Sequence, residues 1–99
     1  MTLIFERIRK LLHQEYSFQY DQIQLTTDFE KELGTDSREM LELINDFETI
    51  FKIEISFDDI DDFIYSGKTI KIHDVVDYIE KKIIEKKIIG RKQLDRNEH

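Results

Sequence analysis

The sequence predicts an all-α fold, a small four-helix bundle with three main helices and one short helix. Pro is absent and Gly occurs only three times in 99 residues, so the residues that usually mark the turns between strands are scarce. Several segments instead place apolar residues three or four positions apart, which is typical of amphipathic helices. Hydrophobic residues make up 39% of the chain. That share and length support one domain with a modest core.

The first predicted helix covers residues 3–15, where apolar residues follow the spacing i, i+4, i+7 and i+8: Ile4, Ile8, Leu11 and Leu12. Residues 16–35 show no sustained period and predict a long connection to the second main helix. Its apolar residues are expected to anchor it on the core: Tyr16, Phe18, Tyr20, Ile23 and Leu25. Within it, Thr27 and Glu30 have the spacing of a capping box for a short turn that Gly34 ends.

The second main helix is predicted over residues 37–51. Asp36 and Glu39 form a cap signature at its start. Its apolar stripe consists of Met40, Ile44, Phe47 and Phe51. The opposite side carries acids: Glu39, Glu42, Asp46 and Glu48.

A short third helix is expected from Phe57 to Ile64, with Gly67 stopping it. A longer fourth helix covers residues 72–89, because its isoleucines and valines keep the helical period until Gly90. We expect residues 1–90 to form the domain, including this extended helix. Residues 91–99 hold only Leu94 as an apolar group and are expected to fray.

The acidic charge is concentrated in the middle of the chain. The formal net charge is −7, whereas residues 36–64 alone hold ten acids and two bases, which gives −8. This block repels phosphate backbones and attracts basic protein surfaces, so we expect no nucleic-acid partner. No apolar run is long enough to span a bilayer, and we expect a cytoplasmic monomer without stable membrane insertion.

The sequence offers no metal site and no thiol chemistry of its own. Cys is absent, which excludes disulfides and thiolate ligands. The aspartates between residues 58 and 62 lack the pattern of a calcium-binding loop, and the three histidines lack ligand spacing. Since no nucleotide or nucleophile motif occurs either, an independent enzyme is not expected.

Ser37 is the residue best placed to carry a covalent group. It follows a glycine-marked loop and opens an acidic helix, where the amide donors and the positive end of the helix dipole favour an anion. A serine at this position alone is more often a capping residue.

The order and spacing of several motifs, between about Phe5 and Lys82, resemble the acyl carrier protein family. The residues that carry the resemblance are Phe29, Leu33, Gly34, Asp36, Ser37, Glu42, Leu43, Glu48, Phe51, Ile53, Glu54, Ile55, Val75, Val76, Asp77, Tyr78 and Ile79. The resemblance implies that a phosphopantetheinyl transferase attaches 4'-phosphopantetheine to Ser37. It also implies that the thiol of this arm carries acyl groups as thioesters, while other proteins perform the chemistry. Asp36 belongs to the motif and is expected to act mainly as a cap.

The resemblance also implies two sets of binding residues. Acids that face the basic docking surfaces of acyl synthases and acyltransferases are expected at Glu39, Glu42, Glu48 and Glu54. An acyl pocket is expected among residues that are first of all core residues: Phe29, Leu43, Ile44, Phe47, Phe51, Val76 and Ile79.

Departures from the family pattern, among them a longer stretch from Ile55 to Tyr78, suggest a specialised carrier. Arg38 stands where the family most often has Leu, and we expect it to contact the phosphate of the arm or an acidic partner. Ser56 stands where Pro is frequent, and the chain continues beyond Lys82. Two alternatives remain open, namely a carrier of amino acids or peptides and an unmodified helical adaptor that binds through its second and last helices.

Overall fold

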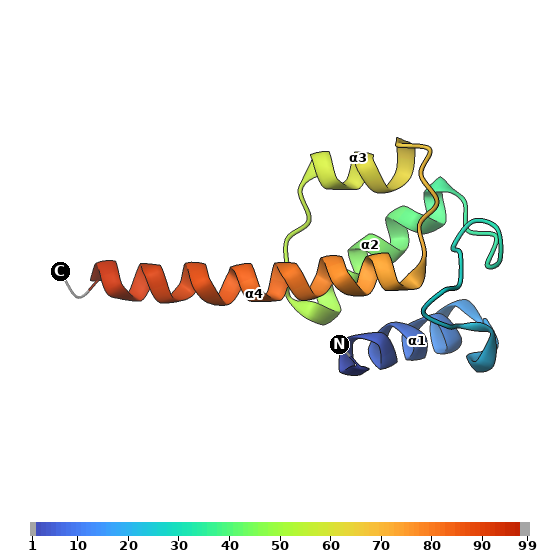
Figure 1. Ribbon diagram of the computed structural model, residues 1–99, viewed down its shortest axis with the longest axis horizontal. Helices are drawn as coiled ribbons and strands as arrows, with labels where there is room; N and C mark the ends of the chain where they lie inside the picture. Colours follow the sequence, from blue (N-terminus) through green and yellow to red (C-terminus); the bar gives the residue numbers. More distant parts are fainter. Residues whose placement is uncertain (1, 98–99) are drawn as a thin grey trace.

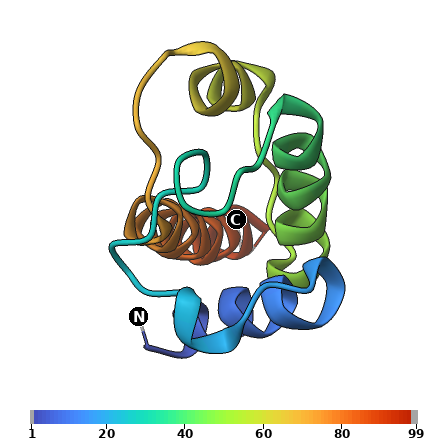
Figure 2. The same cartoon turned by 90° about the vertical axis from the view of Figure 1, so that its right-hand side faces the viewer.

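The computed structural model describes the backbone of residues 2–97 and the side chains of residues 3–88. Its helices, in chain order, are α1 (Thr2–Tyr16), the 3-10 helix η1 (Tyr20–Gln22), α2 (Ser37–Phe51), α3 (Phe57–Tyr65) and α4 (Ile72–Asn97) (Figure 1). Figure 2 views the molecule along α4, with α1, α2 and α3 arranged around it. The predicted all-α fold is confirmed, and α2 begins and ends at the predicted residues.

One core unites α1, α2, α4 and the connections between them. The predicted apolar stripe of α2 is buried in full: Met40, Ile44, Phe47 and Phe51, together with Leu43. It meets Ile8 and Leu12 of α1, and Val76 and Ile79 of α4, all four of which are completely buried. Burying such side chains stabilises the fold by roughly 1.5–3 kcal/mol each. The core therefore holds α2 from two sides and fixes the direction of its N-terminus.

The long connection between α1 and α2 is tied to the segment that leads into α4. The amide of Phe29 donates to the carbonyl of Ile70 at 3.0 Å, and the amides of Ile72 and His73 donate to Thr27 and Leu25, both at 2.9 Å. These bonds hold the connection in place although it has almost no regular structure of its own. They therefore position the residues that precede Ser37.

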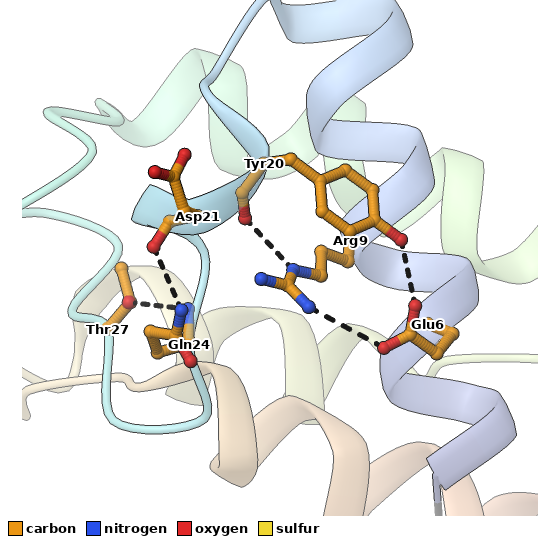
Figure 3. Close-up of polar contacts among 6 residues, drawn as sticks. All are labelled: Glu6, Arg9, Tyr20, Asp21, Gln24 and Thr27. Atoms are coloured by element: carbon orange, nitrogen blue, oxygen red, sulfur yellow. Dashed lines mark hydrogen bonds and ion pairs between the residues drawn. The ribbon is translucent and has the colours of Figure 1, made fainter.

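Only some of the predicted anchors of this connection enter the core. Ile23 is fully buried, but Tyr20 and Leu25 are 39% and 38% exposed, so these two expectations are wrong. Tyr20 instead packs on α1, where the guanidinium of Arg9 lies 4.2 Å from the centre of its ring (Figure 3). Its hydroxyl donates to Glu6 at 2.8 Å, which raises the pKa of Tyr20. Arg9 and Glu6 lie on the same face of α1. The ring of Tyr20 is therefore held by a cation–π contact on the surface of the molecule and not by burial in the core.

The short turn before Gly34 is capped by a different residue from the one predicted. The carboxylate of Asp28 accepts hydrogen bonds from the amides of Glu30 and Lys31, both at 2.9 Å. The Thr27 hydroxyl closes the preceding turn instead, donating to the carbonyl of Gln22 and accepting from the amide of Gln24. The predicted Thr27 cap is wrong because two adjacent residues can both cap a turn, and the carboxylate takes that place.

α4 continues through Gly90 to Asn97, so the predicted helix end at Gly90 is wrong. A glycine inside a helix costs only about 1 kcal/mol relative to alanine, and the good helix formers around it sustain the helix. Figure 1 shows the C-terminal part of α4 projecting beyond the other helices. The fraying of residues 91–99 stays a prediction, and residues 98–99 lie outside the described part. None of the described helices is long and apolar enough to cross a membrane.

Candidate functional site

The N-terminus of α2 is closed by the predicted capping box. The Asp36 carboxylate accepts a hydrogen bond from the amide of Glu39 at 2.8 Å, and the Glu39 carboxylate accepts one from the amide of Asp36 at 3.2 Å. Gly34 precedes the cap with φ of +67°, a conformation that glycine adopts without steric cost. Local sequence therefore determines how the chain enters α2.

Ser37 is the first residue of α2, and its side chain is exposed. Within the described chain its hydroxyl forms no hydrogen bond, and neither do the backbone amides of Ser37 and Arg38. Unpaired amides at the positive end of a helix are the donors that bind phosphate groups. An exposed hydroxyl beside such donors fits the attachment of a phosphate-linked arm.

A pocket of about 520 Å³ lies beside Ser37. One side is formed by Phe29, the segment from Gly34 to Ser37, and Met40. The other side comes from α3 and the connection that follows it: Phe63, Ile64, Gly67, Lys68 and Ile70. The pocket is large enough for a small organic group, and it begins at the predicted attachment residue.

Arg38, next to Ser37 in the sequence, and Lys68, which lines the pocket, have different surroundings. The Arg38 side chain is 89% exposed, lies 3.8 Å from the Glu42 carboxylate and does not line the pocket. Lys68 does line it, and its ammonium group forms no ion pair with any described residue. No sequence pattern pointed to Lys68, because only the packing of α3 against α2 brings it to the pocket beside Ser37.

Replacing Asp36 by alanine is expected to lower the free energy of unfolding by about 1 kcal/mol, because the amide of Glu39 loses its acceptor. Urea unfolding measures this change. Asp36→Asn keeps a side-chain oxygen and should retain most of the stability. An Asp36→Ala protein as stable as the wild type would show that this cap contributes nothing to the fold.

The four acids predicted to face partners differ in their roles within the fold. Glu42 and Glu54 are exposed, whereas Glu39 belongs to the capping box. The Glu48 carboxylate accepts a hydrogen bond from the amide of Ile55 at 2.9 Å and so ties the end of α2 to the next segment. Two of the four acids thus support the fold directly.

The acidic side of α2 also borders a groove of about 690 Å³ against α1. Its acids are Glu15, Glu39, Glu42 and Asp46. The hydroxyl of Tyr16 donates to Asp46 at 2.7 Å, and burial together with this bond raises the pKa of Tyr16. The sequence did not predict that Glu15 lines this groove, because its position depends on how α1 packs on α2.

The residues predicted for an acyl pocket are all buried in the core, between 0% and 9% exposed. Three of them, Ile44, Phe47 and Ile79, line a small apolar cavity of about 10 Å³. The remaining lining residues were not predicted: Met40, Ile55, Phe63, Val75 and Tyr78. Phe29 lines the pocket beside Ser37, whereas Leu43, Phe51 and Val76 border neither space. A cavity of this size holds about one water-sized probe.

The described residues include no group of three or more histidines, aspartates or glutamates that could hold a metal ion. The features of the site are therefore the Ser37 hydroxyl, the helix amides, one adjoining pocket and the acids of α2. These features fit covalent attachment and protein docking.

Comparison with known proteins agrees with this arrangement. The family model described as a phosphopantetheine attachment site matches residues 6–70. An acyl carrier protein from Cylindrotheca sp. (strain N1) is 35% identical over 83 residues, which cover 84% of this chain and 96% of that protein. One from Phytoplasma australiense is 37% identical over 81 residues, covering 82% of this chain and 99% of that protein. The chain thus belongs to the acyl carrier protein family, whose members bear 4'-phosphopantetheine as a covalent group.

Proposed function

We propose that this chain carries acyl intermediates as thioesters on a 4'-phosphopantetheine arm attached to the Ser37 hydroxyl. Partner enzymes of fatty-acid, lipid or polyketide-type synthesis then receive the intermediates. The observation that supports this most is the place of Ser37, exposed at the start of α2 and beside the 520 Å³ pocket. The arm supplies the thiol that this cysteine-free chain lacks.

For attachment of the arm, the chain supplies the Ser37 hydroxyl and the groups around it. The transferase supplies the base that takes the hydroxyl proton. Asp36 is the nearest carboxylate in the sequence, and it is already engaged with the amide of Glu39. It therefore orients the start of α2, and its role here is that of a cap. The amides of Ser37 and Arg38 favour the phosphate through the positive end of the helix.

Two cations are available to the phosphate of the arm. Arg38 is held only by its exposed ion pair with Glu42, and such pairs contribute little. It is thus free to turn towards a phosphate on Ser37. Lys68 approaches from the opposite wall of the pocket. In the proposed function, both Arg38 and Lys68 contact the phosphate of the arm.

Intact-mass measurement tests the proposal. The purified chain is incubated with coenzyme A, magnesium and a broad-specificity phosphopantetheinyl transferase, and the expected result is a single phosphopantetheinyl increment. Thioester profiling of the protein from its own cells then separates acyl groups from aminoacyl groups. A folded sample that gains no mass with several transferases contradicts the proposal and favours an unmodified adaptor.

The exposed acids Glu42 and Glu54 are expected to attract the transferase used for loading. Replacing both by glutamine should lower kcat/KM for loading by about tenfold at low salt and weaken its salt dependence, because steering by charge depends on ionic strength. The control Asp21→Asn/Asp77→Asn removes two acids that are also exposed but lie outside α2 and the segment after it. If both pairs give the same result, the effect comes from net charge and Glu42 and Glu54 are not a docking surface.

The remaining parts of the proposal concern the whole chain. It acts as a monomer in the cytoplasm, without catalytic activity of its own. Residues 1–90 form the carrier domain. Analytical ultracentrifugation of the loaded protein tests the monomer.

A further inference from the structure

α3 buries less side-chain surface than α2 does. Unlike α2, it buries none of its side chains completely, and only three apolar residues, Ile60, Phe63 and Ile64, lie half-buried against the core. It is nine residues long and follows Ser56, whose hydroxyl accepts a hydrogen bond from the amide of Asp59. Segments with so little buried surface open more easily than the core around them.

A polar cluster joins α3 to α4, and we name Asp59, Tyr78 and Lys82 the latch. The Tyr78 hydroxyl donates to Asp59 Oδ2 at 2.5 Å, and the Lys82 ammonium lies 3.7 Å from the same oxygen. The hydrogen bond from Tyr78 is the main cause that lowers the pKa of Asp59, while burial, followed by the bond to Asp59, raises the pKa of Tyr78. Hydrogen bonds to a charged group are stronger than neutral ones, so this cluster helps to keep α3 in place.

The latch also fixes the ring of Phe63. The Phe63 and Tyr78 rings meet edge to face, with centres 5.1 Å apart and planes at 88°. Phe63 comes from α3 and Tyr78 from α4, so this contact crosses the same junction as the latch. If the two helices separate, Phe63 loses its aromatic partner.

The side chain of Phe63 borders two pockets and one groove of the molecule. It lines the pocket beside Ser37, the small apolar cavity, and a groove of about 440 Å³ between α3 and α4. Only Met40 is likewise shared between the Ser37 pocket and the cavity. A chain that extends from Ser37 towards the cavity therefore meets Phe63 and Met40 first.

The cavity, at about 10 Å³, is too small for an acyl chain while α3 is in this position. Ile44, Phe47 and Ile79 on its inner side are almost fully buried in the core of α2 and α4. Close-packed core residues do not make room without loss of stability, whereas α3 has little buried surface to lose. Room for a longer chain therefore costs least stability if α3, and Phe63 with it, moves aside.

We propose that Phe63 determines which acyl chains enter the apolar cavity, and that the latch positions Phe63 by holding α3 against α4. This inference rests on the proposed function for its cargo. The latch itself is a property of the unmodified protein and can be tested without any cargo.

Hydrogen exchange of the unmodified protein tests the latch. Tyr78→Phe removes only the hydroxyl and should speed the exchange of the α3 amides by about tenfold, while the amides of α1 and α2 keep their wild-type rates. Tyr65→Phe is the matched control, because the Tyr65 side chain lies on α3, is 70% exposed and forms no hydrogen bond within the described chain. Equal rates in the two variants would overturn the latch.

A second pair of variants examines the charge of the latch. Asp59→Asn can still accept from Tyr78 but gives up the attraction of Lys82, so its α3 amides should exchange faster than wild type and more slowly than those of Tyr78→Phe. Asp61→Asn on the same helix is exposed and is the control. Wild-type exchange in Asp59→Asn would remove Lys82 from the latch.

Loaded proteins test the role of Phe63. Wild type and Phe63→Ala are prepared with butanoyl, octanoyl or dodecanoyl thioesters, and the rate of cleavage by hydroxylamine reports how far each chain is sheltered. In Phe63→Ala, cleavage of the dodecanoyl thioester should be severalfold slower than in wild type, with little change for butanoyl. Phe57→Ala is the control, since Phe57 is on α3 and 86% exposed.

The two assays separate the two proposals. An identical chain-length profile in wild type, Phe63→Ala and Phe57→Ala would overturn the role of Phe63. A protein that cannot be loaded at Ser37 contradicts the proposed function and the role of Phe63 with it. The exchange rates of the unmodified variants decide the latch in either case.

Discussion

Ser37→Ala is expected to abolish phosphopantetheinylation, leaving the mass of the protein unchanged after incubation with coenzyme A and a transferase. Alanine has no oxygen to form the bond to phosphorus. The variant should keep its fold, because the Ser37 hydroxyl forms no hydrogen bond within the described chain and alanine is a good helix former. Circular dichroism checks the fold of the same sample.

Three other side-chain hydroxyls, those of Thr35, Ser56 and Ser66, form hydrogen bonds within the described chain. Thr35 Oγ1 is buried and donates to the carbonyl of Phe29 at 2.8 Å. Ser56 accepts from the amide of Asp59, and Ser66 accepts from the amide of Lys68. Ser56→Ala and Ser66→Ala should therefore load like the wild type. If Ser37→Ala still gained the full increment, the attachment residue would have to be another one.

The ends of helices were predictable wherever the local sequence allowed only one capping arrangement. Asp36 and Glu39 can cap a helix at only one register, and the start of α2 agrees with it. The short turn before Gly34 offered two capping residues side by side, and its cap was predicted wrongly. Gly90 suggested a helix end, but its cost is small beside that of breaking a long helix. Propensity alone does not decide such positions.

The site was predictable only in part, for a similar reason. The Ser37 motif lies within one short stretch of sequence. Lys68, Phe63 and Tyr78 come from later elements, and their approach to α2 depends on how α3 and α4 pack. The pocket residues that the resemblance implied are apolar, and most of them lie on α2 and α4, which is also true of the core. Sequence pattern therefore identifies core faces but not the gaps between them.

Phe29→Ala is expected to lower the free energy of unfolding by about 3–5 kcal/mol, as truncation of a buried phenylalanine typically does. Phe29 is 1% exposed, and it is the largest fully buried side chain of the molecule's described part. The free energy of unfolding of a native protein is typically only about 5–15 kcal/mol. The variant should therefore unfold at a much lower urea concentration than the wild type. Phe57→Ala removes the same atoms from an 86% exposed position and should change stability by no more than about 0.5 kcal/mol.

The consequence for Ser37 follows from where Phe29 lies. Its ring lines the pocket beside Ser37, and its carbonyl accepts from both the amide and the hydroxyl of Thr35, which is two residues before Ser37. The backbone bonds survive the substitution, but the ring that holds this segment on the core does not. Loading of folded Phe29→Ala should therefore be slower than that of Phe57→Ala even at low temperature, where both are folded. A Phe29→Ala protein with wild-type stability would mean that the connection is held by its backbone bonds to residues 70–73 alone, and that the core residue adds nothing to the position of Ser37.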